Sequence, residues 1–205
     1  KERGLRRRAC GNRTRQADFT GEHKLDRLNI DYTAMYAQTH NNLGVALEQL
    51  VSSALRLNPT LPTANSAYGR ALLGLGDQAE AERAFRKELS VNINDFEANL
   101  MVGSMRKTNQ DFDDALLYLN RALAIHPGDL SARKLVASIK LQTGAVEEAA
   151  KMLEAIVKDS PDSVDAHVQL ATAYNRLKRK DDAAREQEIV NRLNREIQAK
   201  EGSRR

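Results

Sequence analysis

The stretch RALAIHPGDLSA (residues 121–132) sets a histidine, a proline, a glycine and an aspartate side by side. Histidine is the commonest general acid or base in enzymes, so these residues could form a reactive loop, or they could separate two helices. A matching stretch further along, AIVKDSPDSVDA (155–166), keeps the proline but has a serine where the histidine stood. His126 is therefore not repeated, and it has no partner nearby. We interpret 121–132 as a turn between helices, in which Asp129 caps the second helix.

The other residues that could do chemistry form no catalytic or metal-binding constellation. The remaining histidines are dispersed without ligand spacing, and we expect His167 to be a half-buried packing residue. The single cysteine, Cys10, excludes an internal disulfide and a multi-cysteine metal site. No GxxxxGK[ST] phosphate loop is present, and paired acids such as Glu147 and Glu148 open expected helices, where they favour the helix dipole. The sequence therefore predicts no enzyme, no cofactor and no metal.

Charge is distributed unevenly along the 205 residues, although the net charge is only +4. Residues 1–16 carry seven Lys or Arg against one acid, a net +6, so the rest of the chain has a net charge of −2. A basic arm of this kind can bind nucleic acid or an anionic membrane. We interpret residues 1–24 as a solvated, disordered arm, and nucleic acid is the less favoured partner.

No targeting or membrane segment stands out. No run approaches 18 uncharged apolar residues, so we expect no membrane span. The basic start has no apolar stretch behind it, so no secretory signal is visible, which favours the cytoplasm. Because the chain begins with Lys1, a leader that has been removed is compatible with the sequence.

A fixed period, equal to the spacing between Pro127 and Pro161, organises most of the chain. With Pro62 as position 1, three columns hold only small residues in four units. These columns are position 3 (Ala64, Ala98, Ala132, Ala166), position 8 (Gly69, Gly103, Ala137, Ala171) and position 20 (Ala81, Ala115, Ala149, Ala183). Two antiparallel helices approach closely only where side chains are small, so positions 8 and 20 predict a helical hairpin in each unit. Gly76 and Gly144 mark the turn inside a hairpin.

At residues 62–195 this pattern resembles the tetratricopeptide repeat family, whose spacing is W-x2-L-G-x2-Y…A-x3-F…P. The spacing is met in part by Tyr68-Gly69-x2-Leu72…Ala81-x3-Phe85, by Val102-Gly103…Ala115-x3-Leu119…Pro127, and by Val136-Ala137…Ala149-x3-Leu153…Pro161. Position 4 departs from the family because it never carries Trp: it is Asn65, Asn99, Arg133 and His167. The resemblance implies an all-α fold, an α-solenoid (right-handed superhelix) of helix-turn-helix hairpins, with units 62–95, 96–129, 130–163 and 164–195.

The segment 25–61 looks like a degenerate first repeat. Gly44 and Pro59 lie closer together in the sequence than Gly103 and Pro127 of a full unit, and the difference shows that nine residues around the turn are missing. Because no Gly or Pro lies between Val45 and Asn58, the chain has nowhere to turn. We predict one continuous helix from about residue 31 to residue 57.

The opposite end is predicted to close the array. Residues 181–200 are expected to form a C-terminal capping helix, since terminal repeats need a polar outer face, and 201–205 a disordered tail. The apolar face expected to cover the array comprises Ala183, Ile189, Val190, Leu193 and Ile197. A coiled-coil dimer helix is the alternative interpretation.

The resemblance also implies a concave groove lined by the first helix of each unit, at positions 2, 5, 6, 9, 12 and 13. The candidate peptide-binding residues are Arg70, Leu73, Leu100, Met101, Ser104, Lys107, Lys134, Leu135, Ser138, Leu141, Gln142, Val168, Gln169, Thr172, Asn175 and Arg176. Apolar residues and four cations dominate this set, which suits a protein or peptide with apolar and acidic side chains. The alternative is that its cations are solvated and its apolar residues pack between repeats. Position 9 never carries Asn, which argues against the C-terminal carboxylate clamp of some family members.

We therefore expect a non-enzymatic scaffold that binds a protein or peptide in its concave groove. Self-association into dimers or filaments through stacking of the solenoid ends is the alternative, with the irregular N-terminal element as its mediator. Nucleic-acid binding through the basic arm is a third hypothesis, and it predicts binding that weakens with salt.

Overall fold

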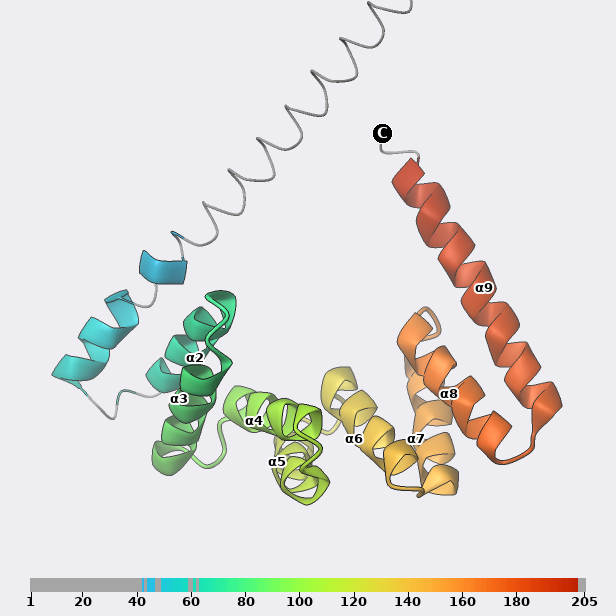
Figure 1. The fold of residues 1–205 in the computed structure, drawn as a ribbon, viewed down its shortest axis with the longest axis horizontal. Helices are drawn as coiled ribbons and strands as arrows, with labels where there is room; N and C mark the ends of the chain where they lie inside the picture. Colours follow the sequence, from blue (N-terminus) through green and yellow to red (C-terminus); the bar gives the residue numbers. More distant parts are fainter. Residues whose placement is uncertain (1–41, 43, 47–48, 59–60, 62, 203–205) are drawn as a thin grey trace, which may run out of the picture.

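The computed structural model describes residues 42, 44–46, 49–58, 61 and 63–202. These residues contain helices and no strand. Residues 42, 44–46 and 49–57 are helical, and eight further helices follow in the described chain (Figure 1). They are α2 (Ala64–Gly74), α3 (Gln78–Val91), α4 (Phe96–Thr108), α5 (Phe112–Ile125), α6 (Leu130–Gln142), α7 (Val146–Asp159), α8 (Val164–Arg176) and α9 (Lys180–Gly202).

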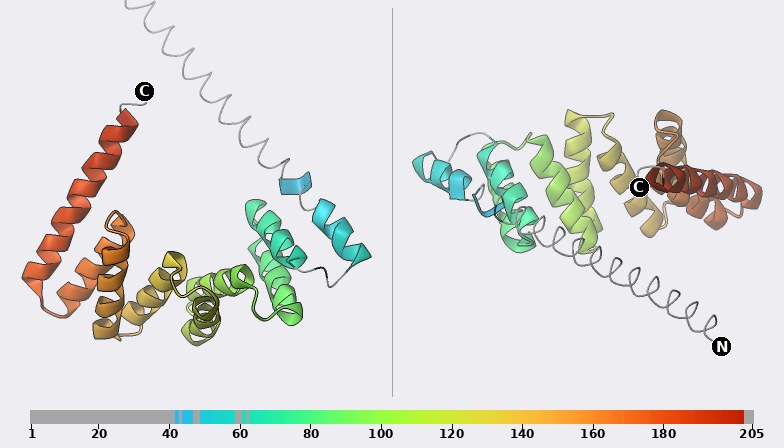
Figure 2. Two further views of the ribbon diagram at one scale, coloured as in Figure 1. Left: turned by 180° about the vertical axis from the view of Figure 1, so that it is seen from behind. Right: turned by 90° about the horizontal axis from the view of Figure 1, so that it is seen from above.

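The helices pair into hairpins, and each predicted unit contains one. α2 packs on α3, α4 on α5, α6 on α7, and α8 on α9, and each hairpin also contacts the next. Two further views show the hairpins following one another in a row along a curved path (Figure 2). The all-α solenoid that the family resemblance implied is confirmed.

Small residues let the two helices of a hairpin approach, as positions 8 and 20 predict. A Cβ atom built on Gly69 would lie 2.8 Å from ring carbons of Phe85, and one on Gly103 would lie 2.7 Å from Cγ of Leu119. Both distances are shorter than a real Cβ contact, so only glycine fits there without a shift. Ala81, at position 20, is fully buried, as are the alanines of the next two units.

Large apolar side chains fill the space beside these close contacts. At position 24, Phe85, Leu119 and Leu153 are fully buried, and each belongs to a different core cluster. Each cluster combines one hairpin with the first helix of the next unit, so the core is continuous along the array. In the last unit position 24 is Gln187, which is exposed on α9, and no further repeat covers that face within the described residues.

The predicted ends of the array coincide only in part with the described helices. The predicted arm 1–24 lies outside the described residues. So do residues 31–41, 43, 47 and 48 of the predicted helix 31–57. The described residues of that helix are all helical. A Cβ on Gly44 would lie 3.0 Å from Cδ2 of Leu75, so this segment packs against the end of α2.

At the C-terminus, α9 extends to Gly202, because residues 198–201 are good helix formers. The tail predicted from residue 201 is therefore wrong for its first two residues.

The apolar face of α9 covers the array over part of its predicted length. Ala183, Val190 and Leu193 are buried and Ile189 is half-buried, but Ile197 is exposed. Within the described chain, no α9 residue beyond Leu193 is buried. The last two turns of α9 therefore project past α8 (Figure 1).

The turns between units confirm the interpretation of 121–132. His126 ends α5, and its ring meets that of Phe96 edge to face at 4.6 Å. Asp129 Oδ1 accepts a hydrogen bond of 2.8 Å from the backbone N–H of Ala132 and caps α6. Asp95 caps α4 in the same way. Carboxylates at these positions satisfy backbone donors that a helix start leaves free.

Position 15, inside each hairpin, adopts the left-handed backbone conformation in all four units. The predicted turn glycines Gly76 and Gly144 have φ of 85° and 90°. Gln110 and Lys178 occupy the same position with φ of 62° and 61°. A side chain at positive φ costs roughly 1–2 kcal/mol, so these two turns are strained relative to the glycine turns.

Replacing Gln110 or Lys178 by glycine is expected to stabilise the protein. Glycine removes the steric cost of the left-handed conformation, which outweighs the entropy that it adds to the unfolded chain, for a net gain of about 0.5–1 kcal/mol per site. Urea unfolding followed by circular dichroism measures the change.

Gln142→Gly is the matched control, because Gln142 is the last residue of α6 and has a helical backbone. It is expected to lose about 0.5–1 kcal/mol. A comparable loss for Gln110→Gly would show that strain in the turn is negligible.

Candidate functional site

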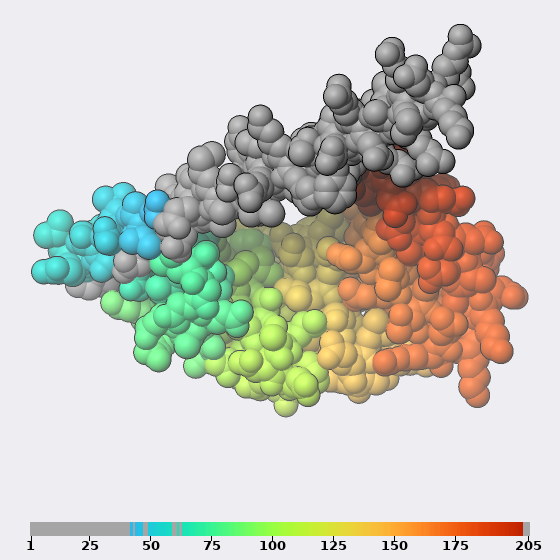
Figure 3. Space-filling view, turned by 45° about the horizontal axis from the view of Figure 1, so that its top comes forward, coloured from blue at the N-terminus to red at the C-terminus, as the bar shows by residue number. Residues whose placement is uncertain are grey.

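The first helices of three consecutive units, α4, α6 and α8, form one continuous inner layer. α4 contacts α6 and α6 contacts α8, although each pair is separated by a whole intervening helix in the sequence. Consecutive hairpins also touch along the face visible in the space-filling view (Figure 3). Because the inner helices are in contact across units, side chains from three repeats reach one surface, as a groove requires.

A hollow of about 440 Å³ lies on α4, α6 and α8, and we call it the central hollow. Its lining residues are Lys107, Ser131, Lys134, Leu135, Ser138, Asp165, Val168 and Gln169. Six of these eight belong to the predicted groove set. Ser131 and Asp165 complete the lining of the hollow, and both occupy position 2, which faces the same surface. The structure thus brings together predicted residues from three different repeats.

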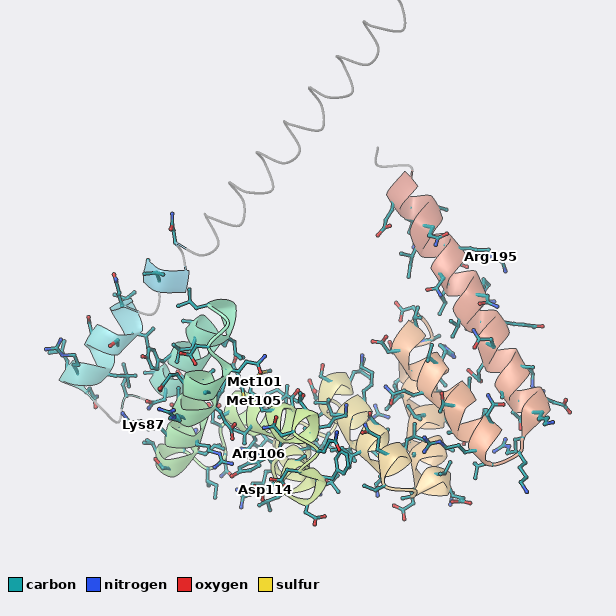
Figure 4. All side chains as sticks on the ribbon, in the orientation of Figure 1. Lys87, Met101, Met105, Arg106, Asp114 and Arg195 are labelled. Atoms are coloured by element: carbon teal, nitrogen blue, oxygen red, sulfur yellow. The ribbon has the colours of Figure 1, made fainter. Side chains whose placement is uncertain are left out.

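A second hollow of about 420 Å³, which we call the lateral hollow, lies between α2, α3 and α4. It is lined by Leu73, Gln78, Ala79, Glu82, Met101, Ser104, Met105, Thr108 and Asn109. Leu73, Met101 and Ser104 were predicted, whereas the α3 residues were missed because they come from a second helix. Met105 was also missed, although its place four residues after Met101 puts both on one side of α4 (Figure 4).

Two predicted groove residues belong to the core instead. Leu100 is 8% exposed and packs with Leu119 and Val136, and Leu141 is 6% exposed and packs with Leu153. Both pack between neighbouring repeats, because the next unit closes over them. Their assignment to the groove is therefore wrong.

The remaining predicted groove residues lie on the surface outside both hollows. Of the described groove candidates, those that line neither hollow and stay on the surface are Arg70, Gln142, Thr172, Asn175 and Arg176. Arg70 forms an ion pair of 2.9 Å with Glu97, and the Arg176 guanidinium donates to the backbone oxygen of Leu141. Both arginines therefore link neighbouring repeats.

The cations of the central hollow differ in their partners. Lys134 Nζ lies 3.6 Å from Oδ2 of Asp165, in the first turn of α8. Lys107, half-buried near the end of α4, has no ion pair within the described part of the chain. Two lysines and one aspartate thus line the hollow, which leaves it with a net positive charge.

Polar side chains beside the groove link helices both within a hairpin and between neighbouring units. Arg106 bonds Glu82, at the edge of the lateral hollow, and this hydrogen bond raises the pKa of the guanidinium. Burial raises the pKa of Tyr174 to about 12, and its hydroxyl donates to Glu154 at 2.9 Å. His167, predicted to be half-buried, is buried, and its ring bonds Glu186 of α9.

Neither a metal site nor a membrane-spanning helix is found in the described chain. Its His, Cys, Asp and Glu residues form no group of three or more that could hold an ion. No helix among the described residues is long and apolar enough to cross a membrane.

Two sequence profiles described as tetratricopeptide repeat match the chain, one at residues 105–171 and the other at residues 33–95 and 67–130. No curated protein sequence matches it. Solved structures of similar fold include MamA from Desulfovibrio magneticus RS-1, with a TM-score of 0.67 at 22% identity, covering 78% of this chain and 96% of that one. A crystal structure of YrrB has a TM-score of 0.66 at 21% identity, with coverage of 74% and 78%. For pilF from Pseudomonas aeruginosa the TM-score is 0.62 at 14% identity, with coverage of 77% and 76%. At these identities the likeness is one of fold.

Alanine substitutions are expected to separate core residues from groove residues. Leu100→Ala opens a cavity between two repeats and should lower the free energy of unfolding by about 2–4 kcal/mol. Val168→Ala, on the exposed side of α8, should cost less than about 1 kcal/mol. Urea unfolding of both variants measures the difference. Similar small losses for both would show that Leu100 is a groove residue and not a core residue.

Proposed function

The chain belongs to the tetratricopeptide repeat family, and we propose that it is an interaction scaffold whose concave face binds an extended segment of a partner protein. The observation that carries this proposal is the central hollow, where side chains of α4, α6 and α8 form one concave surface. Its floor mixes apolar Leu135 and Val168 with hydroxyl and amide groups. Pockets that bind a segment of protein combine apolar contact area with a few polar groups that orient the ligand.

The two hollows lie on opposite flanks of α4, which suits an extended ligand. Lys107 of α4 lines the central hollow, while Met101 and Met105 line the lateral one. A helix is about 10 Å across with its side chains, and an extended chain advances about 3.3 Å per residue. A segment that crosses α4 would therefore insert side chains about three residues apart into the two hollows.

A structural neighbour supports the choice of ligand class. The YrrB structure is described as that of a protein of this fold with an unusual peptide-binding site. We take from it only that a peptide is a reasonable ligand for a solenoid of this size. The residues of the site proposed here rest on this chain's own geometry.

Substitution of Val168 by glutamate is expected to weaken peptide binding at least about tenfold, because a charge would replace an apolar contact in the hollow. Peptides are first selected from a random display library on the full chain, and their affinities are measured by fluorescence anisotropy. Val168 is 44% exposed, so the variant should keep its fold, which a thermal melt verifies.

The matched control is Leu117→Glu, since Leu117 is 47% exposed on α5, outside both hollows. This variant is expected to bind the selected peptides within about twofold of the unaltered chain. Equal affinity of all three proteins would place peptide binding away from the concave face.

Self-association is a second candidate, favoured by apolar residues at the N-terminal end of the described array. Leu50 and Leu57 are 69% and 89% exposed on the helical segment 49–57. The nearby Leu61 is exposed as well. A second copy that packs against this end would bury these leucines, which water solvates poorly.

The double variant Leu50→Lys, Leu57→Lys is expected to raise the dissociation constant of a dimer at least about tenfold, because it places charges in the interface. Sedimentation equilibrium of the full chain over a range of concentrations measures the constant. Leu117→Lys is the control on α5. A chain that stays monomeric at all concentrations would exclude this candidate.

A further inference from the structure

In two of the repeat junctions, an acid at position 2 pairs with a cation of the inner layer. Glu97, in the first turn of α4, forms an ion pair of 2.9 Å with Arg70 of α2. Asp165, in the first turn of α8, lies 3.6 Å from Nζ of Lys134 of α6. At each of these junctions the acid neutralises a cation that the preceding unit presents to the concave face.

The junction between α4 and α6 has a cation but lacks the acid. Position 2 of the third unit is Ser131, and the first turn of α6 contains no acidic residue. Lys107 of α4 lines the central hollow together with Ser131 and has no ion pair within the described residues. The one acid that lines the hollow, Asp165, is already engaged by Lys134.

We propose that the central hollow binds an acidic side chain of the partner segment, which pairs with Lys107 and takes the place of the missing position-2 acid. This inference rests on the proposed function, since it specifies which chemistry the groove selects. The net positive charge of the hollow favours an anion. Ser131 and Ser138 bring hydroxyl groups that can donate to a carboxylate oxygen.

The positive end of α6 adds to this preference. Ser131 is the second residue of the 13-residue helix α6, so the partial positive charge of the helix start lies beside the hollow. The Asp129 carboxylate accepts from one backbone donor there, the N–H of Ala132. A carboxylate beside Ser131 would therefore be stabilised by the lysine and by the helix start together.

The test uses matched peptides chosen from those that bind the full chain, all with an amidated C-terminus. One peptide of each pair contains Glu or Asp at the position under test, and the other contains Gln or Asn. The acidic peptide is expected to bind about fivefold to tenfold tighter at low salt, and the ratio should fall as salt rises. A third peptide, with Gln and a free C-terminal carboxylate, tests the chain end as the source of the acid.

Two substitutions probe the site from the protein's side. Ser131→Asp supplies the missing acid within the chain, so the ratio of the two affinities should fall to about one. This acid stands in the first turn of a helix, where it is favourable, so the fold should be kept. Lys107→Glu should invert the ratio, so that the amide peptide binds tighter than the acidic one.

Asn120→Asp is the control, because it makes the same change of net charge on an exposed residue of α5, away from the hollow. It is expected to leave the affinity ratio unchanged. An equal fall in Asn120→Asp and Ser131→Asp would show that the effect is one of overall charge and would overturn the proposed site.

The outcomes separate this inference from the proposed function. If Val168→Glu abolishes binding while the acidic and amide peptides bind equally well, the groove functions without an acid subsite and the inference is wrong. If only the peptide with a free C-terminus gains affinity through Lys107, the hollow takes a chain end and the inference is again wrong. If neither Val168 nor Lys107 affects any selected peptide, both proposals fail.

Discussion

The close approach of the two helices in each hairpin is the constraint on which the array depends. At Gly69 and Gly103 even a methyl group would overlap the Phe85 ring or the Leu119 side chain. This contact fixes how the first helix of a unit sits on the second. The next hairpin then packs on the same surface, and its first helix completes the core cluster. The inner layer, and with it the groove, follows from a hairpin geometry that small residues permit.

The groove is what remains of the inner layer after the core has been filled. Leu100 and Leu141 face the neighbouring unit and are buried, while Leu135 and Val168 stay at the surface. Ion pairs between units then decide which charges remain available to a ligand. Arg70 is neutralised within the protein by Glu97, whereas Lys107 lines the central hollow with no ion pair among the described residues. The proposed recognition of an acidic side chain therefore depends on where the repeat departs from its own pattern.

Hydrogen bonds surround the start of the first helices near position 4, where the chain lacks the tryptophan of the family pattern. The buried side-chain amide of Asn99 donates to the backbone oxygens of Ile93 and Asp95, both at 2.8 Å. In the first unit, the fully buried carboxylate of Glu88 accepts from the backbone N–H groups of Thr63 and Asn65. The Asn99 bonds fix the start of α4 against the turn that precedes it, and the Glu88 bonds join the two helices of the first hairpin.

The sequence by itself determined the period, the hairpins, the repeat positions that hold small residues and the helix caps, because each depends on contacts within one repeat. It also predicted a groove on one face of the first helices. Only the tertiary structure decided that Leu100 belongs to the core, since its burial depends on the next unit. The left-handed turn at Gln110 gave no glycine signal, because hairpin packing imposes it on an unsuited residue. The central hollow likewise required three repeats to be placed side by side, because no single repeat contains all of its lining residues.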